Sequence, residues 1–360
     1  MRIKFFFKNK RLTDYKLLVY ILINFQILKM FIYKNYFKNK KIIVTGHTGF
    51  KGSWLTLCLN LLGAKVLGIS KDYPTSPSHF KDLNITKNIQ NKIFDITNLK
   101  KLKKIFKKFQ PDYVFHLAAQ AIVSKSFKDP ISTFNSNTIG TLNVLESLRA
   151  VKKCKAVIIT SDKSYKNLEI KRGYSENDII GGNDPYSGSK GAAELIINSY
   201  IKSFFINKKR IKIAIARAGN VIGGGDWSTD RIIPDCVKSW YKNKKIIIRS
   251  PKSTRPWQHV LDAIRGYLIL AIKLDDKKIN GEAFNFGPDN KQNKNVLDLV
   301  KEIKKIVGKG LPIYGKIQMR KDEPLKLYPN LTRFKKFINL RNEININSGL
   351  KSTIRYYKNS

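Results

Sequence analysis

The chain has few residues of the kinds that build metal sites and disulfides. Its 360 residues include only 3 cysteines and 4 histidines. Cys58, Cys154 and Cys236 lie far apart without a CxxC spacing, which favours a reducing compartment such as the cytoplasm and predicts no metal site. Long apolar stretches are missing as well. Residues 17–28 are mostly apolar but fall short of the about 20 residues that span a bilayer, so we expect no integral membrane span.

Acidic residues are also scarce, at 26 against 69 basic residues, which gives a formal net charge of +43. Such an excess can serve nucleic acid or an anionic membrane, and a non-catalytic basic scaffold is kept as a remote alternative. The lysines are spread over the whole chain, however, together with many Asn, Ile, Phe and Tyr, all encoded by AT-rich codons. We therefore attribute the charge to base composition and predict no nucleic-acid partner.

Residues 1–39 are predicted to be an N-terminal extension. A basic region precedes the apolar residues 17–28, but no small-residue cleavage site follows before the basic cluster at 34–41. Met30 begins a short basic lead directly before the first predicted strand, which favours a mis-assigned start and predicts that protein beginning at Met30 folds and acts. An interfacial membrane anchor and an ordered extra helix are the alternatives.

After Lys41 the sequence alternates between strand-like and helix-like segments, which predicts an α/β fold with a doubly wound parallel sheet. Gly63 is expected to cap the first helix. The predicted strands are 42–45, 66–69, 113–117, 156–160 and 211–216, and the main helices are 53–62, 99–109 and 140–150.

The alternation fails from about Gly223, where prolines divide the chain into shorter elements. We therefore predict a dinucleotide-binding Rossmann domain over 40–222. Residues 223–360 are predicted to form mainly a smaller substrate-binding lobe, interleaved with late elements of the large domain.

Three glycines follow the first predicted strand in the order expected for a dinucleotide loop. Gly46 permits the tight turn, Gly49 allows a pyrophosphate to approach the backbone, and Gly52 lets the helix pack against the strand. The helix N-terminus supplies N–H donors to the same phosphates. Thr48 and Phe50 complete the predicted loop.

Other residues at strand ends are candidates for contacts with the rest of the cofactor. Asp72 lies roughly twenty residues after the glycines and could bind the ribose hydroxyls, although Ser70 and Lys71 lie nearer the strand end, so NAD and NADP both remain open. Asp95 could hold the adenine amino group. Small residues after the third predicted strand would let a cofactor lie on the backbone, in the segment Leu117, Ala118, Ala119 and Gln120.

Tyr186 and Lys190 are four residues apart at the start of a predicted helix and so share one face. An ammonium beside a phenol favours the phenolate, which predicts a base usable near neutral pH. Ser161, Asp162 and Lys163 follow an apolar strand, and ligands of open α/β sheets bind at such strand ends.

Several longer strings resemble those of one known family. They are residues 44–54 (VTGHTGFKGSW), 116–120 (HLAAQ), 160–163 (TSDK), 186–190 (YSGSK), 217–227 (RAGNVIGGGDW), 255–260 (RPWQHV) and 285–288 (NFGP). The glycine and YxxxK motifs are typical of short-chain dehydrogenases/reductases in general. The strings GHTGFKGSW, GNVIGGGDW and RPWQHV are narrower and resemble the CDP-glucose branch of the nucleotide-sugar 4,6-dehydratases, which are extended short-chain dehydrogenases/reductases.

The resemblance implies an NAD-dependent hydro-lyase that converts CDP-glucose to CDP-4-keto-6-deoxyglucose for deoxysugar and surface polysaccharide synthesis, such as O-antigen. It implies that Tyr186 removes the O4 proton while Ser161 holds that oxygen. Lys163 would then take the C5 proton, and a protonated Asp162 would protonate the departing C6 hydroxyl.

The resemblance also implies substrate contacts from Asn220, Arg255 and His259, with the Arg255 guanidinium on the diphosphate. Asn137 would relay protons to the lysine, and a homodimer would form through two helices per subunit. Other nucleotide-sugar dehydratases, acting on dTDP-glucose or GDP-mannose, and epimerases are the alternatives. Residues 321–324 depart from the family pattern, which leaves base recognition open.

Overall fold

The computed structural model describes residues 30–207, 210–288, 293–308, 326–340 and 342–358. Their main feature is a seven-stranded sheet in the order β10-β6-β5-β4-β1-β2-β3, in which all neighbouring strands are parallel. The strands are β1 (Lys41–Thr45), β2 (Lys65–Ser70), β3 (Gln90–Ile93), β4 (Tyr113–His116), β5 (Cys154–Ile159), β6 (Ile211–Ala218) and β10 (Ala283–Phe286).

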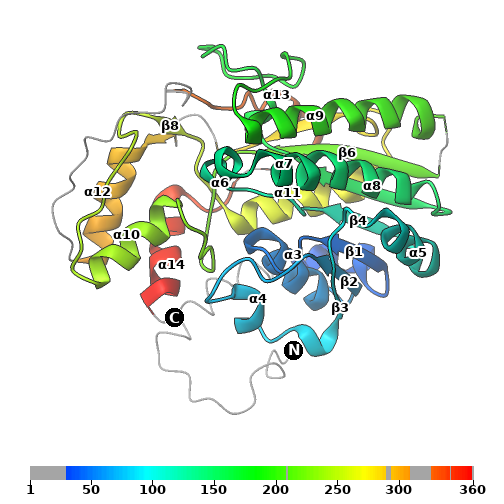
Figure 1. The fold of residues 1–360 in the computed structure, drawn as a ribbon, viewed down its shortest axis with the longest axis horizontal. Helices are drawn as coiled ribbons and strands as arrows, with labels where there is room; N and C mark the ends of the chain where they lie inside the picture. Colours follow the sequence, from blue (N-terminus) through cyan, green and yellow to red (C-terminus); the bar gives the residue numbers. More distant parts are fainter. Residues whose placement is uncertain (1–29, 208–209, 289–292, 309–325, 341, 359–360) are drawn as a thin grey trace.

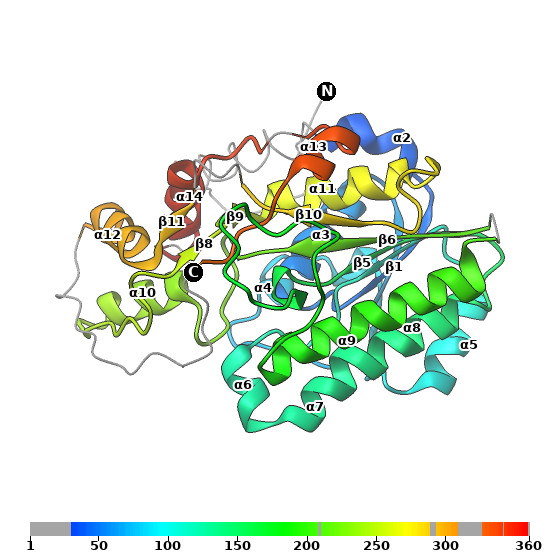
Figure 2. The ribbon, with the colours of Figure 1, turned by 90° about the horizontal axis from the view of Figure 1, so that it is seen from above.

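Helices cover both faces of this sheet (Figure 2). Side chains of a strand point alternately to the two faces, so Ile42 and Val44 pack with one set of helices and Ile43 with the other. The first set contains α3 (Phe50–Leu61) and α11 (Val260–Lys273), and the second contains α5 (Leu99–Phe109), α8 (Gly140–Leu148) and α9 (Pro185–Tyr200). Burial on both faces explains why the central strands are almost continuously apolar.

The predicted α/β fold with a doubly wound parallel sheet is confirmed. All five predicted strands and the three main helices are present with shifts of a few residues at their ends, and Gly63 follows α3 with φ of +80°. Strand β3 was not predicted, because its sequence QNKI is polar and lies at an exposed edge of the sheet. The strand order reverses between β1 and β4, which creates a crevice at their carboxyl ends.

A second group of helices lies beyond one end of the sheet (Figure 1). It contains α10 (Ile232–Tyr241), α12 (Val296–Val307) and α14 (Ile346–Lys358), which share a core that includes Trp240, Ile303 and Ile354. Two short pairings join it to the large domain: β7 (Val221–Ile222) with β9 (Gln258–His259), and β8 (Thr254–Arg255) with β11 (Lys294–Asn295).

The late part of the chain also contributes to the large domain. Helix α11, strand β10 and helix α13 (Thr332–Phe337) all pack into the core on one face of the sheet. The predicted boundary between the Rossmann domain (40–222) and the smaller lobe (223–360) stays a prediction. The remaining short helices are α4 (His79–Asp82), α6 (Val123–Lys128) and α7 (Pro130–Phe134).

The predicted extension lies only partly within the described residues. Residues 1–29, like the divergent segment 321–324, are outside them. Met30 is buried in the core, and Phe37 at the end of α2 (Lys34–Phe37) packs on Tyr113 with ring centroids 5.1 Å apart. This lead before β1 is therefore part of the packed domain. Within the described ranges, every helix is too short or too polar to cross a bilayer.

Candidate active site

The glycine loop between β1 and α3 has the shape of a phosphate cradle. Gly46 has φ of +75°, and a Cβ on it would lie 2.6 Å from the backbone nitrogen of Ala118. A Cβ on Gly52 would lie 2.0 Å from the Gly46 carbonyl oxygen, so both positions require glycine. A Cβ on Gly49 would meet only that same oxygen, at 3.3 Å. The space before the N-terminus of α3 is thus open to a pyrophosphate, as the predicted cofactor needs.

The predicted ribose and adenine residues lie at the ends of neighbouring strands. Thr48 donates its hydroxyl hydrogen to the Asp72 carbonyl oxygen at 2.6 Å, which joins the glycine loop to the end of β2. Asp95 follows β3 and lies 3.1 Å from the Lys71 ammonium. Burial opposes ionisation of Asp95, but the Thr97 N–H and Lys71 outweigh it and lower its pKa. The roles of Asp72 and Asp95 toward a cofactor stay predictions.

The segment after β4 is tied to α9 through Asn137. The Gln120 N–H donates to Asn137 Oδ1 at 2.8 Å, and the Asn137 amide donates to the Gln120 carbonyl and to Ser189 Oγ, at 3.1 and 2.9 Å. These contacts fix the segment from Leu117 to Gln120 beside the glycine loop. They engage Asn137 with Gln120 and Ser189, so a proton relay from Asn137 to Lys190 stays a prediction.

Helix α9 carries the predicted Tyr–Lys pair into the interior. Asp184 caps its first turn by accepting the Tyr186 and Ser187 N–H groups, both at 3.0 Å. Tyr186 and Lys190 are then 8% and 6% exposed. The Ser161 side chain lies close enough to the Tyr186 hydroxyl to act on its pKa, which brings together two residues predicted to act on one substrate oxygen.

Lys190 is not among the main causes of the Tyr186 pKa shift, so its predicted effect on the phenol stays a prediction. Burial raises the Tyr186 pKa, and the Ser161 side chain and the charge of Arg231 only partly offset this. Lys190 is itself affected, because burial and then repulsion from Lys51 lower its pKa to about 7. The cation that favours the phenolate here is Arg231, which sequence analysis did not select.

Lys51 is a second functional candidate that sequence reasoning missed. It is the second residue of α3, and its charge lowers the Lys190 pKa. Burial and then the charge of Arg231 lower the pKa of Lys51 itself to about 8. The sequence did offer a clue to Lys51, because it is a cationic residue within the glycine motif that is expected to bind phosphate. Arg231 had no comparable signal, because its proximity to Tyr186 depends on how the chain folds back from the smaller lobe.

Ser161, Asp162 and Lys163 form a compact turn at the carboxyl end of β5. Ser161 Oγ accepts the Lys163 N–H and donates to Asp162 Oδ1, both at 3.2 Å. Burial raises the Asp162 pKa despite the nearby cations Lys163, Arg255 and Lys51. Its Oδ2 is buried without a hydrogen-bond partner among the described residues. Asp162 is therefore suited to stay protonated and to donate that proton.

A cavity of about 240 Å³ lies between this turn and the smaller lobe. Three predicted residues from separate segments line it, namely Lys163, Asn220 and Arg255. Residues that were not predicted complete its polar wall, among them Asp184, Asp226, Arg231 and Arg249. The cavity thus joins an acid–base turn to several arginines suited to a diphosphate.

His259, a predicted substrate contact, lies between α11 and α14. Its Nδ1 accepts the Leu261 N–H at 3.3 Å and caps α11, while its Nε2 faces Ser352 Oγ on α14 at 3.4 Å. Burial lowers its pKa to about 4, so it is neutral near pH 7. His259 is not among the residues that line the cavity, and its contact with substrate stays a prediction.

The phosphate cradle and the buried tyrosine open on the same edge of the sheet. This defines a Rossmann-fold enzyme that acts through a dinucleotide. A family model described as the NAD dependent epimerase/dehydratase family matches residues 42–287. The chain belongs to this family, and NAD is the cofactor for the cradle, which settles the choice between NAD and NADP.

Individual relatives agree with this assignment. The chain is 46% identical over 269 residues to a CDP-glucose 4,6-dehydratase from Salmonella typhimurium, with 73% of this chain and 75% of the relative covered. It is 30% identical to a dTDP-D-glucose 4,6-dehydratase from Dictyostelium discoideum, covering 73% and 61% of the two chains. An epimerase structure from Methanothermobacter thermautotrophicus superposes with a TM-score of 0.82 at 26% identity, covering 92% and 96%.

Proposed function

We propose that the chain converts CDP-glucose to CDP-4-keto-6-deoxyglucose, as an NAD-dependent hydro-lyase. The observation that carries the proposal is one turn that serves two acid–base pairs: Ser161 acts on Tyr186, and Asp162 lies beside Lys163, which lines the cavity. An oxidation at one carbon needs a single base, whereas a subsequent loss of water needs a further acid and base. The similarity to the Salmonella typhimurium enzyme supports the same reaction.

The first pair serves oxidation at C4. Tyr186 takes the O4 proton, and Ser161, whose side chain lies close to the phenol, holds the same oxygen. NAD held by the glycine loop would supply the hydride chemistry, as acceptor for oxidation at C4 and as donor for the later reduction at C6, so the overall reaction involves no net redox change. Arg231 provides positive charge that favours the phenolate form of Tyr186.

The second pair serves the loss of water. The 4-ketone acidifies the C5 proton, which Lys163 removes from its position on the cavity wall. Asp162 gives its proton to the departing C6 hydroxyl, and the burial that raises its pKa keeps that proton available. Arg255 and Asn220 hold the nucleotide diphosphate on the opposite wall.

The decisive experiment is turnover by the purified protein. Incubation with CDP-glucose should give a 4-keto-6-deoxy product, identified by mass, with dTDP-glucose and GDP-mannose as matched controls. Faster turnover of either control would assign the site to another nucleotide-sugar dehydratase. Inversion without loss of water would assign it to an epimerase.

A homodimer is part of the proposal, because exposed apolar side chains gather on adjoining helices. Ile131 on α7 is 75% exposed, Leu195 on α9 is 62% exposed and Ile139 is 42% exposed. Helices α7, α8 and α9 lie together on one face of the molecule (Figure 2). A second copy of the chain would cover these side chains.

We further propose a cytoplasmic enzyme that supplies deoxysugar for surface polysaccharide such as O-antigen. The cytoplasmic location is in line with its three unpaired, buried cysteines.

A further inference from the structure

A buried carboxylate joins the two halves of the catalytic machinery. Glu194 lies on α9 one helical turn after Lys190 and is 0% exposed. Its Oε1 accepts the hydroxyl hydrogens of Thr160 at 2.7 Å and of Ser164 at 2.9 Å. A single side chain of the helix that carries Tyr186 therefore contacts the turn after β5 at two points.

These two hydroxyls flank the segment that carries the other catalytic groups. Thr160 directly precedes Ser161, and Ser164 directly follows Lys163. The single hydroxyl hydrogen of Ser164 is shared between Glu194 Oε1 and the Ser161 carbonyl oxygen, which lies 2.5 Å from Ser164 Oγ and closes the turn on itself. Because Thr160 and Ser164 stand at the two ends of the turn, the Glu194 carboxylate holds it at both ends.

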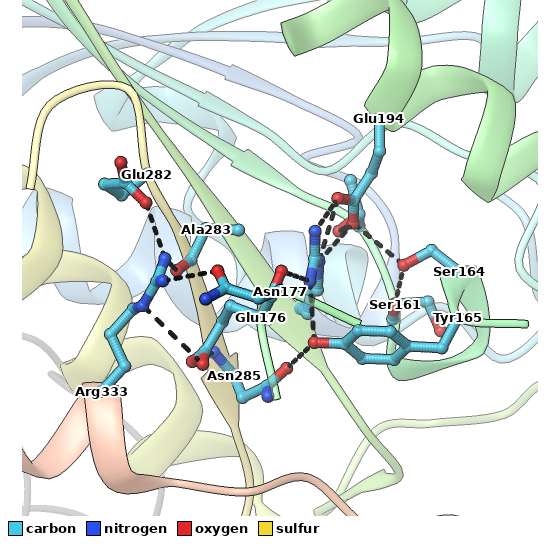
Figure 3. A network of polar contacts seen from close by, with 12 residues as sticks. Ser161, Ser164, Tyr165, Glu176, Asn177, Glu194, Glu282, Ala283, Asn285 and Arg333 are labelled. Carbon is cyan, nitrogen blue, oxygen red and sulfur yellow. Dashed lines mark hydrogen bonds and ion pairs between the residues drawn. The ribbon is translucent and has the colours of Figure 1, made fainter. Parts of the chain in front are cut away.

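Arg217 on β6 balances the charge of this carboxylate. Its Nε and Nη2 donate to Glu194 at 2.9 and 2.6 Å, and the two side chains are 3% and 0% exposed. Burial works against the Arg217 charge, but Glu194 outweighs it and raises the guanidinium pKa. Figure 3 shows how the network continues through the Tyr165 hydroxyl to Asn285 Oδ1, at 2.7 Å, on β10.

Stability alone is a weak reason for such a pair. Two charges removed from water gain little over apolar residues of the same volume, so buried ion pairs contribute mainly to specificity of structure. Here the pair is aimed at the hydroxyls that bracket the acid–base turn, and every heavy-atom distance in it is 2.9 Å or less. The ion pair and its two hydroxyl contacts therefore fix the position of α9 relative to the turn after β5.

We propose that Glu194 is a positioning residue that, through Thr160 and Ser164, holds Ser161, Asp162 and Lys163 in register with Tyr186 and Lys190. The inference rests on the proposed function and adds to it a residue that touches neither substrate nor cofactor. Both half-reactions depend on this register, because the C4 oxygen must reach Tyr186 and Ser161 while C5 and C6 reach Lys163 and Asp162.

The test removes the two hydroxyls and leaves the ion pair intact. In the Thr160→Val/Ser164→Ala double variant, kcat should fall about 10- to 100-fold, the range expected when reacting groups move by roughly 1 Å. The KM for CDP-glucose should change less than about twofold, because the cavity wall around Arg255 is unaltered. A crystal structure of the variant with NAD should show Ser161 displaced from Tyr186 while α9 keeps its place.

Two matched controls separate positioning from general loss of packing. Thr160→Ser keeps the hydroxyl and loses a methyl group, so it should retain kcat within about twofold, whereas Thr160→Val should not. Tyr165→Phe removes an equally buried hydroxyl of the same network on the far side of Arg217. It should lower the thermal unfolding midpoint and leave kcat near the wild-type value.

Several results would overturn the proposal. They are an unchanged kcat in the double variant, a rise in KM at constant kcat, or equal losses in Thr160→Val and Thr160→Ser. If the double variant does not fold, the Thr160→Val and Ser164→Ala single variants decide by the same criteria. If the wild-type chain does not turn over CDP-glucose, the proposed function fails, and the Ser161–Tyr186 separation in the variant crystals still decides the positioning role.

Discussion

Asp162 and Gly219 face each other so closely that a Cβ on Gly219 would lie 2.9 Å from Asp162 Oδ2. The same Cβ would lie 2.7 Å from the ring of Pro256, so the carboxyl group is the part that can move. We expect Gly219→Ala to displace the Asp162 carboxyl and slow the loss of water about 10- to 100-fold, with oxidation at C4 little affected.

Rapid mixing of the Gly219→Ala variant with CDP-glucose would test this by comparing the NADH absorbance with the release of water from the sugar. The variant should accumulate NADH and a 4-keto hexose. Equal slowing of both steps would show that the alanine disturbs the whole site and not the acid alone.

Tyr186→Phe should abolish the first step. The phenolic oxygen is the proposed base for O4, and Ser161 and Lys190 cannot replace it as a proton acceptor while keeping their own positions. The expected result is no NADH absorbance when CDP-glucose is added to the NAD-loaded variant. Reduction of bound NAD at the wild-type rate would disprove the assignment of Tyr186.

Lys163→Ala should separate the two half-reactions. Oxidation at C4 should stay largely intact, so bound NADH and a 4-keto hexose should accumulate in a single turnover without release of water. Loss of one acid–base group costs about 100- to 10,000-fold in the step that it serves. Mass analysis of the sugar gives the readout, and elimination at the wild-type rate would leave Asp162 or water as the base.

Burial of Lys190 gives stability a defined pH dependence. Its pKa is lowered from 10.5 to about 7 in the folded chain, so the unfolded chain binds more protons between these values. The free energy of unfolding from this group should therefore rise with pH above about 7, by at most about 1.4 kcal/mol per pH unit.

Lys190→Met removes this titration. Urea unfolding of both proteins at about pH 7 and about pH 8.5 should give a smaller increase in unfolding free energy for the variant than for the wild type. Parallel increases would mean that Lys190 keeps an ordinary pKa in the folded chain.

The proposed dimer predicts that a charge on α9 dissociates it. Leu195→Lys places an ammonium on the exposed apolar surface of Ile131, Ile139 and Leu195, and sedimentation velocity should show a monomer. Ile32→Lys is the matched control, because Ile32 is 70% exposed but lies before β1. It should leave the association state unchanged. Identical sedimentation of the wild type and Leu195→Lys would rule out this surface as the interface.

Most of the sheet could be predicted because burial on both faces leaves a direct trace in the sequence. Strands β1, β2, β4, β5 and β6 are apolar runs for this reason. Strand β3 leaves no such trace, since Gln90 and Lys92 at the sheet edge contact solvent. It is a strand because its backbone pairs with β2, and not because its residues are apolar.

The site divides in the same way between local and distant contacts. The spacing of the glycines predicted the glycine loop, and the position directly after an apolar strand predicted Ser161 to Lys163. Both features can be recognised from a few adjacent residues. Arg231 and Glu194 could not be found, since their partners lie on other segments and only folding brings them together. The side-chain direction of His259 could not be predicted either, because it follows from capping α11, which the string RPWQHV does not reveal.

The Tyr357 hydroxyl donates to the Asp226 carbonyl oxygen at 2.7 Å, and Tyr357 lines the cavity. Helix α14 is made after every other segment that contributes to this wall. During synthesis the sheet and glycine loop can form first, since domains fold from the N-terminal side as the chain emerges. The part of the cavity wall that Tyr357 forms is therefore the last part of the site to be made.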